Sequence, residues 1–181
     1  MQVTSHRHLR RAQRDCLRLA WCATGAAAGL GLALWAVSFP LDSPFLLASL
    51  GGSTVFLFGM TRAPAAQPRA LVGGHLGSAF IGILCWQCVG DSLWVYGLAI
   101  SLTLVFMLLT RTMHPPAGAT PLIMVHAHAN FGALWQPVGL AVLLLALAAA
   151  LWSRMTPGMV NYPVVWLDKS PPSIWWGGWD D

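Results

Sequence analysis

Two stretches of the sequence place hydroxyl groups, glycines and a histidine inside otherwise apolar surroundings: Ser49–Thr54 and the residues around His114. A residue that precedes proline avoids the α-helical region, so we expect His114 to be extended. Pro121 suits the first position of a helix, with Thr120 as its hydroxyl N-cap. We therefore predict that Ala117–Thr120 is unwound and opens a short helix with uncovered amide N–H groups. Such a terminus favours anions, through its free donors and the positive end of the helix dipole.

The first stretch offers comparable parts for binding a small anion. Glycines let a backbone approach a ligand closely, and hydroxyl groups can replace the water that the ligand loses. The candidate anion-binding residues of this stretch are Ser49, Gly51, Gly52, Ser53 and Thr54. Those of the second stretch are His114, Gly118, Ala119 and Thr120. An alternative interpretation stays open, in which small residues at these positions only let helices touch each other.

His75 and Arg111 complete the candidate anion site. A charged or titratable group at membrane depth is costly and normally faces a cavity or a partner. His75 could titrate near neutral pH, bind the substrate or hydrogen-bond a carbonyl group. Arg111 could instead lie at the cytoplasmic end of its helix, with its guanidinium group extending to the membrane surface.

Two further pairs of residues have the spacing of metal or redox sites. His126 and His128 resemble a metal-binding pair, but no carboxylate or cysteine lies near them in the sequence. Cys85 and Cys88 form a C-x-x-C motif, which fits a redox or metal pair as well as two buried cysteines that act as small apolar residues. We predict no metal site and no cofactor.

The sequence also lacks the side-chain sets typical of enzymes. Asp42 and Asp91 are single acids in loops, and no paired carboxylates or Ser–His–Asp combination is present. Of the 181 residues, 56% are hydrophobic and only 9% are charged. Soluble domains carry about a quarter charged residues. We therefore predict an integral membrane protein that is not an enzyme.

Six apolar segments can be distinguished. Four of them approach the length of about 20 residues that a helix needs to cross a bilayer. These are Leu19–Phe39, Ala70–Val89, Leu93–Thr110 and Leu134–Trp152. Two shorter runs, Pro44–Met60 and Pro115–His126, are interrupted by glycine or proline. The second reaches only about 18 Å as a helix, against a hydrocarbon core of about 30 Å.

The basic residues indicate how many segments cross the membrane. If all six cross and the N-terminus is cytoplasmic, all 10 Lys and Arg residues fall on the cytoplasmic side, as the positive-inside rule requires. The side chains that then fall outside are Asp42, Asp91, His126 and His128. With only four crossings, Arg62, Arg69 and Arg111 would lie outside. The charges therefore favour six crossings.

The predicted fold is an all-α integral membrane bundle of two three-segment halves, the second inverted relative to the first. Short interrupted segments in matching positions of two such halves indicate a substrate site near mid-membrane. We expect a basic cytoplasmic segment (residues 1–18), a transmembrane domain (19–154) and a cytoplasmic tail rich in Trp and Pro (155–181).

Glycines spaced four residues apart occur at Gly25 and Gly29 and at Gly73 and Gly77. This spacing puts small residues on one helical face, so that two helix backbones can approach closely. The two faces could pack within the chain or form a homo-oligomer.

The stretches Gln67–His75 and Leu109–Thr120 resemble the HPP family of integral membrane proteins, which is named for the His-Pro-Pro found here at residues 114–116. The resemblance covers about residues 40–166. It implies a membrane protein, with plant plastid and cyanobacterial relatives associated with nitrite transport. Pro121 departs from the family pattern, in which a small apolar residue is usual at this position.

We therefore predict a transporter or channel for a small inorganic anion, with nitrite as the best single candidate, in a bacterial inner membrane. Backbone N–H groups and hydroxyls of the two stretches would hold the anion. His75 and His114 would supply donors, or a proton if transport is proton-coupled. The alternatives are a metal-ion transporter or metal-binding membrane protein that uses His126, His128 and the cysteines, and a non-transporting membrane subunit. No nucleic-acid partner is expected.

Overall fold

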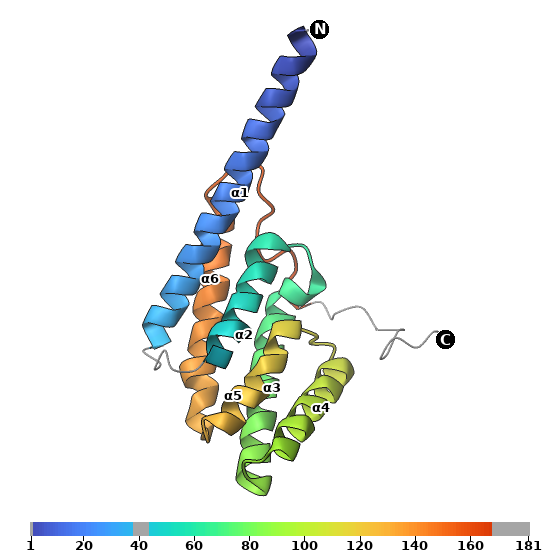
Figure 1. Ribbon diagram of the computed structural model, residues 1–181, viewed down its shortest axis with the longest axis vertical. Helices are drawn as coiled ribbons and strands as arrows, with labels where there is room; N and C mark the ends of the chain where they lie inside the picture. Colours follow the sequence, from blue (N-terminus) through green and yellow to red (C-terminus); the bar gives the residue numbers. More distant parts are fainter. Residues whose placement is uncertain (1, 38–43, 168–181) are drawn as a thin grey trace, which may run out of the picture.

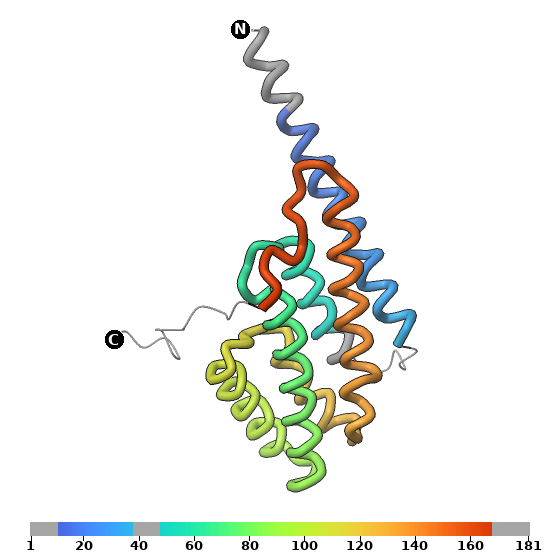
Figure 2. The backbone as a smooth tube through the Cα atoms, turned by 180° about the vertical axis from the view of Figure 1, so that it is seen from behind, coloured from blue at the N-terminus to red at the C-terminus, as the bar shows by residue number. Residues whose placement is uncertain are grey.

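The computed structural model describes the backbone of residues 2–37 and 44–167, and the side chains of residues 11–37 and 48–167. Six α-helices follow one another in this part of the chain, joined by short 3-10 and π-helical segments. They are α1 (Gln2–Val37), α2 (Pro44–Thr54), α3 (Pro68–Val89), α4 (Leu93–Thr110), α5 (Thr120–His126) and α6 (Leu140–Arg154). Successive helices alternate in direction along the long axis of the molecule, and α6 runs beside α1 (Figures 1 and 2).

Four helical segments are long and apolar enough to cross a membrane. These are Arg11–Val37, Pro68–Val89, Leu93–Thr110 and Phe131–Arg154. They correspond to the four long apolar runs of the sequence, which confirms that prediction. Most large apolar side chains of α4 are exposed, as lipid contact requires. Phe39, Asp42 and the tail from residue 168 onward lie outside the described residues.

Arginine side chains lie at one end of the bundle, where Asp15 pairs with Arg18 at 3.8 Å, and Asp91 lies at the other end. At the start of α3, Arg69 donates to the carbonyl oxygens of Thr110 (2.9 Å) and Arg111 (3.1 Å) at the end of α4. Beyond the other end of α3, His128 Nε2 lies 2.8 Å from Asp91 Oδ2. The 22 residues of α3 separate these two pairs by about 33 Å. The six crossings stay a prediction: four helices are long enough to cross, whereas α2 and α5 have only 11 and 7 residues.

The first short segment is not broken, which corrects the sequence-based expectation. Pro44–Thr54 is a regular α-helix that continues as the π-helical segment η1 (Val55–Gly59), so the helix passes through Gly51 and Gly52 without interruption. The physical reason is that a lipid-embedded backbone must satisfy its own hydrogen bonds. Gly52 instead serves close packing: a Cβ added there would lie 3.0 Å from Pro116.

The second short segment also differs from its prediction. Pro115–Ala119 forms a 3-10 helix, η3, which leads directly into α5 at Thr120. The amide of Ala117 donates to His114 and that of Thr120 to Ala117, while Pro115 has no amide hydrogen. The N-cap position of α5 is Ala119 and not Thr120, which is the first residue of the helix. The expected stretch of uncovered amides at Ala117–Thr120 is therefore absent, because 3-10 turns use these donors.

Small residues bring neighbouring segments close to the backbones of α1 and α3. A Cβ atom added to each glycine would collide with a neighbouring side chain: with Trp152 at Gly25, with Phe58 at Gly29, with Thr112 at Gly73 and with Phe106 at Gly77. Both Gly-x-x-x-Gly faces are thus occupied within the chain. The structure does not support a homo-oligomer that forms through these two faces.

Candidate functional site

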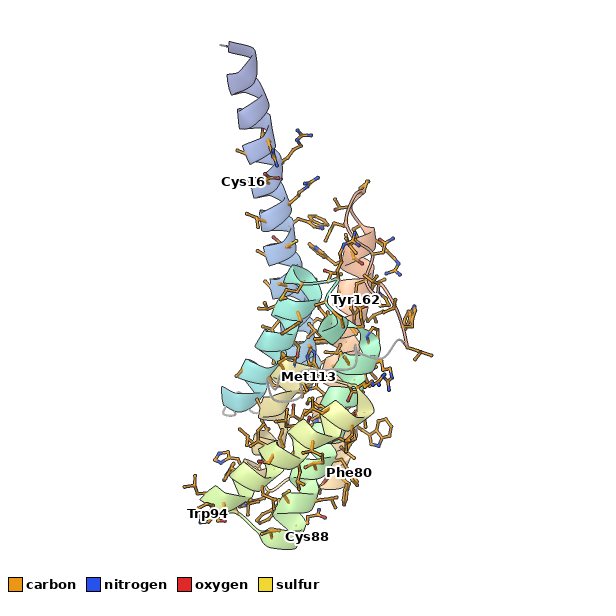
Figure 3. All side chains as sticks on the ribbon, turned by 90° about the vertical axis from the view of Figure 1, so that its right-hand side faces the viewer. Cys16, Phe80, Cys88, Trp94, Met113 and Tyr162 are labelled. Carbon is orange, nitrogen blue, oxygen red and sulfur yellow. The ribbon has the colours of Figure 1, made fainter. Side chains whose placement is uncertain are left out.

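Five polar side chains form one hydrogen-bonded chain inside the bundle. They are Ser49 and Ser53 of α2, His75 of α3, His114 before η3, and Thr120 of α5. Each has at most 2% of its surface exposed. Met113, which precedes His114, lies between Tyr162 toward one end of the bundle and Cys88 and Trp94 at the other (Figure 3). All five side chains were candidates from the sequence, so the fold brings both stretches together.

His114 is held through both of its ring nitrogens. Nδ1 lies 2.6 Å from the carbonyl oxygen of Ala65, and Nε2 lies 2.9 Å from Ser53 Oγ. A carbonyl oxygen only accepts hydrogen bonds, so Nδ1 must carry a hydrogen. Ala65 belongs to the short 3-10 segment η2 (Pro64–Ala66). The sequence could not single it out, because any residue offers a carbonyl oxygen.

His75 continues the chain on the other side of Ser53. Its Nε2 lies 2.9 Å from Ser53 Oγ, and its Nδ1 lies 3.0 Å from Thr120 Oγ1. Thr120 Oγ1 lies 3.3 Å from Ser49 Oγ, which donates to the carbonyl oxygen of Pro116 at 3.0 Å. The two imidazole rings have centroids 5.1 Å apart. One hydroxyl group therefore bridges two histidines.

Local backbone geometry explains how these groups meet. Ser49 and Ser53 are one helical turn apart and share a face of α2. His114 has φ −134° and ψ 94°, the extended conformation predicted from the proline that follows it. Gly74 leaves room for this histidine, since a Cβ on Gly74 would lie 3.0 Å from His114 Cβ. The site thus depends on a glycine of α3 and on the Pro115 ring.

Three other candidates from the first stretch do not contribute to this chain through the contacts that the structure describes. The Thr54 hydroxyl donates to the Leu50 carbonyl oxygen in its own helix, at 2.8 Å. Gly52 packs on Pro116, whereas a Cβ on Gly51 would meet nothing within 4 Å.

The remaining candidates, Arg111, Gly118 and Ala119, are not among the five hydrogen-bonded side chains. Arg111 is exposed, with φ 53°, at the C-terminal end of α4, which agrees with the alternative that it marks a helix end. Gly118 and Ala119 are half-buried in η3, and Gly118 faces Ile100.

Gln67 is a buried polar residue for which the sequence suggested no role. Its Nε2 donates to the carbonyl oxygens of Thr61 (2.8 Å) and Ala63 (3.0 Å). Its Oε1 accepts from the amides of Val164 (3.0 Å) and Val165 (3.2 Å). Gln67 therefore ties the segment before α3 to the segment after α6. The only signal in the sequence is an uncharged polar residue before a proline that begins a helix.

The residues of the metal-site alternative lie at the opposite end of the bundle. His128 contacts Asp91, and its ring stacks on Trp86 with centroids 3.9 Å apart. The hydrogen bond from His128 lowers the pKa of the Asp91 carboxyl. Cys85 is buried and Cys88 is exposed, so they face different surroundings. Within the described ranges, no group of three or more His, Cys, Asp or Glu side chains is placed to hold a metal ion.

A cavity of about 750 Å³ lies where α1, η1 and the segment after α6 meet. Its lining includes Arg18 and Arg62 and no carboxylate. Phe58 of η1 lines this cavity, and Phe56 of the same segment has its ring 5.6 Å from that of His114. The π-helical segment η1 therefore contacts both the cavity and the buried polar chain.

Comparison with known proteins adds a family match. Residues 11–163 match a family described as HPP, transmembrane region. One Dictyostelium discoideum protein, named only as a transmembrane protein, is 34% identical over 145 residues, which cover 76% of this chain and 46% of that protein. A second Dictyostelium transmembrane protein is 31% identical over 134 residues, which cover 67% of this chain and 45% of that protein. The chain thus spans about half the length of these relatives. No solved structure matches it.

Proposed function

The chain belongs to the HPP transmembrane family, and from this premise we propose that it moves a small inorganic anion across the bilayer. Nitrite is the first candidate, because the resemblance noted in the sequence implies relatives associated with nitrite transport. The relatives found by comparison carry names that say only that they are transmembrane proteins.

The buried chain from Ser49 to His114 is the observation that carries this proposal. Polar groups inside a membrane bundle are costly, and they commonly mark the path of a substrate or ion. The five side chains come from three different helices and from the connection before η3, so packing within a single helix does not account for them. A chain of this kind can offer several hydrogen-bond donors to an ion that has lost its water.

The donors in this mechanism are side chains, in place of the backbone amides expected from the sequence. Ser53, Thr120 and the histidine N–H groups now satisfy one another. An anion is a stronger acceptor than a neutral hydroxyl or imidazole nitrogen. An anion that enters would therefore take over some of these hydrogen bonds, and the chain would close again when the anion leaves.

Access from the basic end is consistent with the proposal. Arg18 and Arg62 line the cavity there, and Asp15 pairs with Arg18 at 3.8 Å. The net positive charge of these three side chains raises the local concentration of anions. Phe58 of η1 lines this cavity, and Phe56 of the same segment lies beside His114. Movement of η1 would then control entry, a role that fits the frequent presence of π-helical turns at functional sites.

The two short helices α2 and α5 occupy corresponding places in the order of the six helices. They meet through Ser49 and Thr120, whose hydroxyl oxygens lie 3.3 Å apart. We propose that the chain consists of two inverted halves, α1–α3 and α4–α6, with the site between their short middle helices, as in other transporters.

Flux of nitrite into liposomes that contain the purified protein tests the proposal. We expect flux above that of empty vesicles, which corrects for passive diffusion of the undissociated acid. Ser53→Ala should reduce this flux about tenfold, the effect of losing one hydrogen bond of about 1.5 kcal/mol to a charged ligand.

Ser78→Ala is the matched control, because Ser78 is also buried but donates only to Gly74 of its own helix among the described contacts. The Ser78 variant should retain wild-type flux. If nitrite flux does not exceed that of empty vesicles, nitrite is excluded as the substrate. An equal loss of flux in both variants would mean that the five buried polar side chains have only a structural role.

A further inference from the structure

The Ser53 hydroxyl has three hydrogen-bonding neighbours but only one hydrogen to donate. Its oxygen lies 2.9 Å from each of three groups: the carbonyl oxygen of Ser49, His75 Nε2 and His114 Nε2. A serine hydroxyl has one hydrogen to donate and two lone pairs to accept with. The direction of this one O–H bond therefore decides which protonation states the two rings can have.

With both histidines neutral, the hydrogens can be assigned. The carbonyl oxygen of Ala65 requires a hydrogen on His114 Nδ1. In the neutral ring His114 Nε2 is then an acceptor, and the Ser53 hydroxyl donates to it. Ser53 then accepts from His75 Nε2–H, and His75 Nδ1 accepts from the Thr120 hydroxyl. In this arrangement the carbonyl oxygen of Ser49 receives no hydrogen from Ser53.

One added proton is accommodated without moving a heavy atom. A proton on His114 Nε2 turns that nitrogen into a donor to Ser53, and the Ser53 hydroxyl rotates to donate to the carbonyl oxygen of Ser49, already at 2.9 Å. Ser53 then accepts from both rings. His114 donates through both nitrogens, to Ser53 and to Ala65, so every polar hydrogen retains a partner.

We propose that the Ser53–His75–His114 cluster binds one proton together with the anion, so that anion and proton cross as an electroneutral pair. This inference rests on the proposed anion transport and adds its coupling ion and stoichiometry.

The charge balance of the site supports pairing with an anion. Besides each other, the described hydrogen-bond and ring partners of the two histidines are Ser53, Thr120, Ala65 and Phe56, and none of these is a carboxylate or a guanidinium group. A lone imidazolium buried in such surroundings is strongly disfavoured. An anion beside it cancels the charge, so the arrival of each ion favours binding of the other.

The geometry also limits the number of protons to one. The ring centroids of His75 and His114 are only 5.1 Å apart, so two imidazolium rings would repel each other in an apolar interior.

The test measures protons and nitrite together in liposomes that contain the wild-type protein and a trapped pH indicator, with the membrane potential set by potassium and valinomycin. We expect one proton per nitrite, and nitrite accumulation that does not respond to potential. An uncoupled anion would instead change its accumulation about fiftyfold per 100 mV.

Nitrite flux that carries no protons and follows the potential would overturn the proton pairing while leaving anion transport intact. Absence of any nitrite flux would remove both. A second measurement needs no flux: in the ¹⁵N-histidine spectrum of purified protein, nitrite should convert one ring to imidazolium. His128→Gln, at the exposed far end, should keep this signal and His114→Gln should lose it. A spectrum that nitrite leaves unchanged would contradict the inference.

Discussion

Gly82 of α3 lies directly against the backbone of Pro121 in α5: a Cβ added to the glycine would come 2.6 Å from both the Cα atom and the carbonyl oxygen of the proline. Backbone atoms cannot move aside as a flexible side chain can. This contact fixes how closely α5 approaches α3, and therefore where Thr120 lies relative to His75.

We predict that Gly82→Ala destabilises the protein by about 1–3 kcal/mol, the usual effect of overpacking a well-packed interior. The midpoint of thermal unfolding in detergent measures this change. Gly97→Ala is the control, because Gly97 lies in α4 with open space around its Cα; alanine there should be neutral or stabilising. Equal midpoints for the two variants would contradict the close contact.

Gln67→Ala should release the segment that follows α6. The substitution removes the bonds from Val164 and Val165 to Gln67 Oε1 and should cost about 1–3 kcal/mol, because buried groups lose their partners. Hydrogen exchange at residues 160–166 should become faster than in the wild type. Gln87→Ala, which changes an exposed glutamine near the other end of α3, should leave this exchange unchanged. Unchanged exchange in Gln67→Ala would show that the segment is held by other contacts.

Tyr162→Phe should stabilise the protein by about 1 kcal/mol, because the tyrosine hydroxyl is buried and the described part of the chain offers it no hydrogen-bond partner. The same burial raises the pKa of this phenol. The measurement is again the unfolding midpoint. Tyr96→Phe is the comparison, since Tyr96 hydrogen-bonds Asp91 and should lose stability. A lower midpoint for Tyr162→Phe would mean that its hydroxyl has a partner.

The Asp91–His128 pair predicts a pH dependence. The hydrogen bond from His128 lowers the pKa of Asp91 below its ordinary value of 3.8. A carboxyl with a lowered folded-state pKa contributes stability above its unfolded pKa and loses it as the pH falls through the folded value. The wild type should therefore exceed Asp91→Asn in unfolding midpoint near pH 6, and this difference should vanish near pH 2.

The control for this prediction is the same comparison in a His128→Gln background. Removing the histidine should shrink the effect of Asp91→Asn at pH 6, as a double-mutant cycle for two contacting residues requires. A difference that stays constant across pH, or that is the same in both backgrounds, would show that the pair contributes nothing measurable.

Local features of the sequence determined the membrane character and the four long helices, because both depend on apolar run length and on low charge. The extended conformation of His114 was equally predictable, since the Pro115 ring excludes the α region for its neighbour. The His-Pro-Pro stretch also identified the family correctly, as the match over residues 11–163 confirms.

Only the tertiary structure decided which candidate side chains meet and what happens to the backbone around them. Gly51 and Gly52 signalled a break, yet the helix continues, because in lipid the chain satisfies its amides internally and its glycines can serve packing. Thr120 has the sequence of an N-cap, but a preceding 3-10 helix supplies the hydrogen bonds and leaves its hydroxyl for His75. The Ala65 carbonyl oxygen that orients His114 has no signal in the sequence, because a backbone acceptor becomes part of a site only when the fold brings it there.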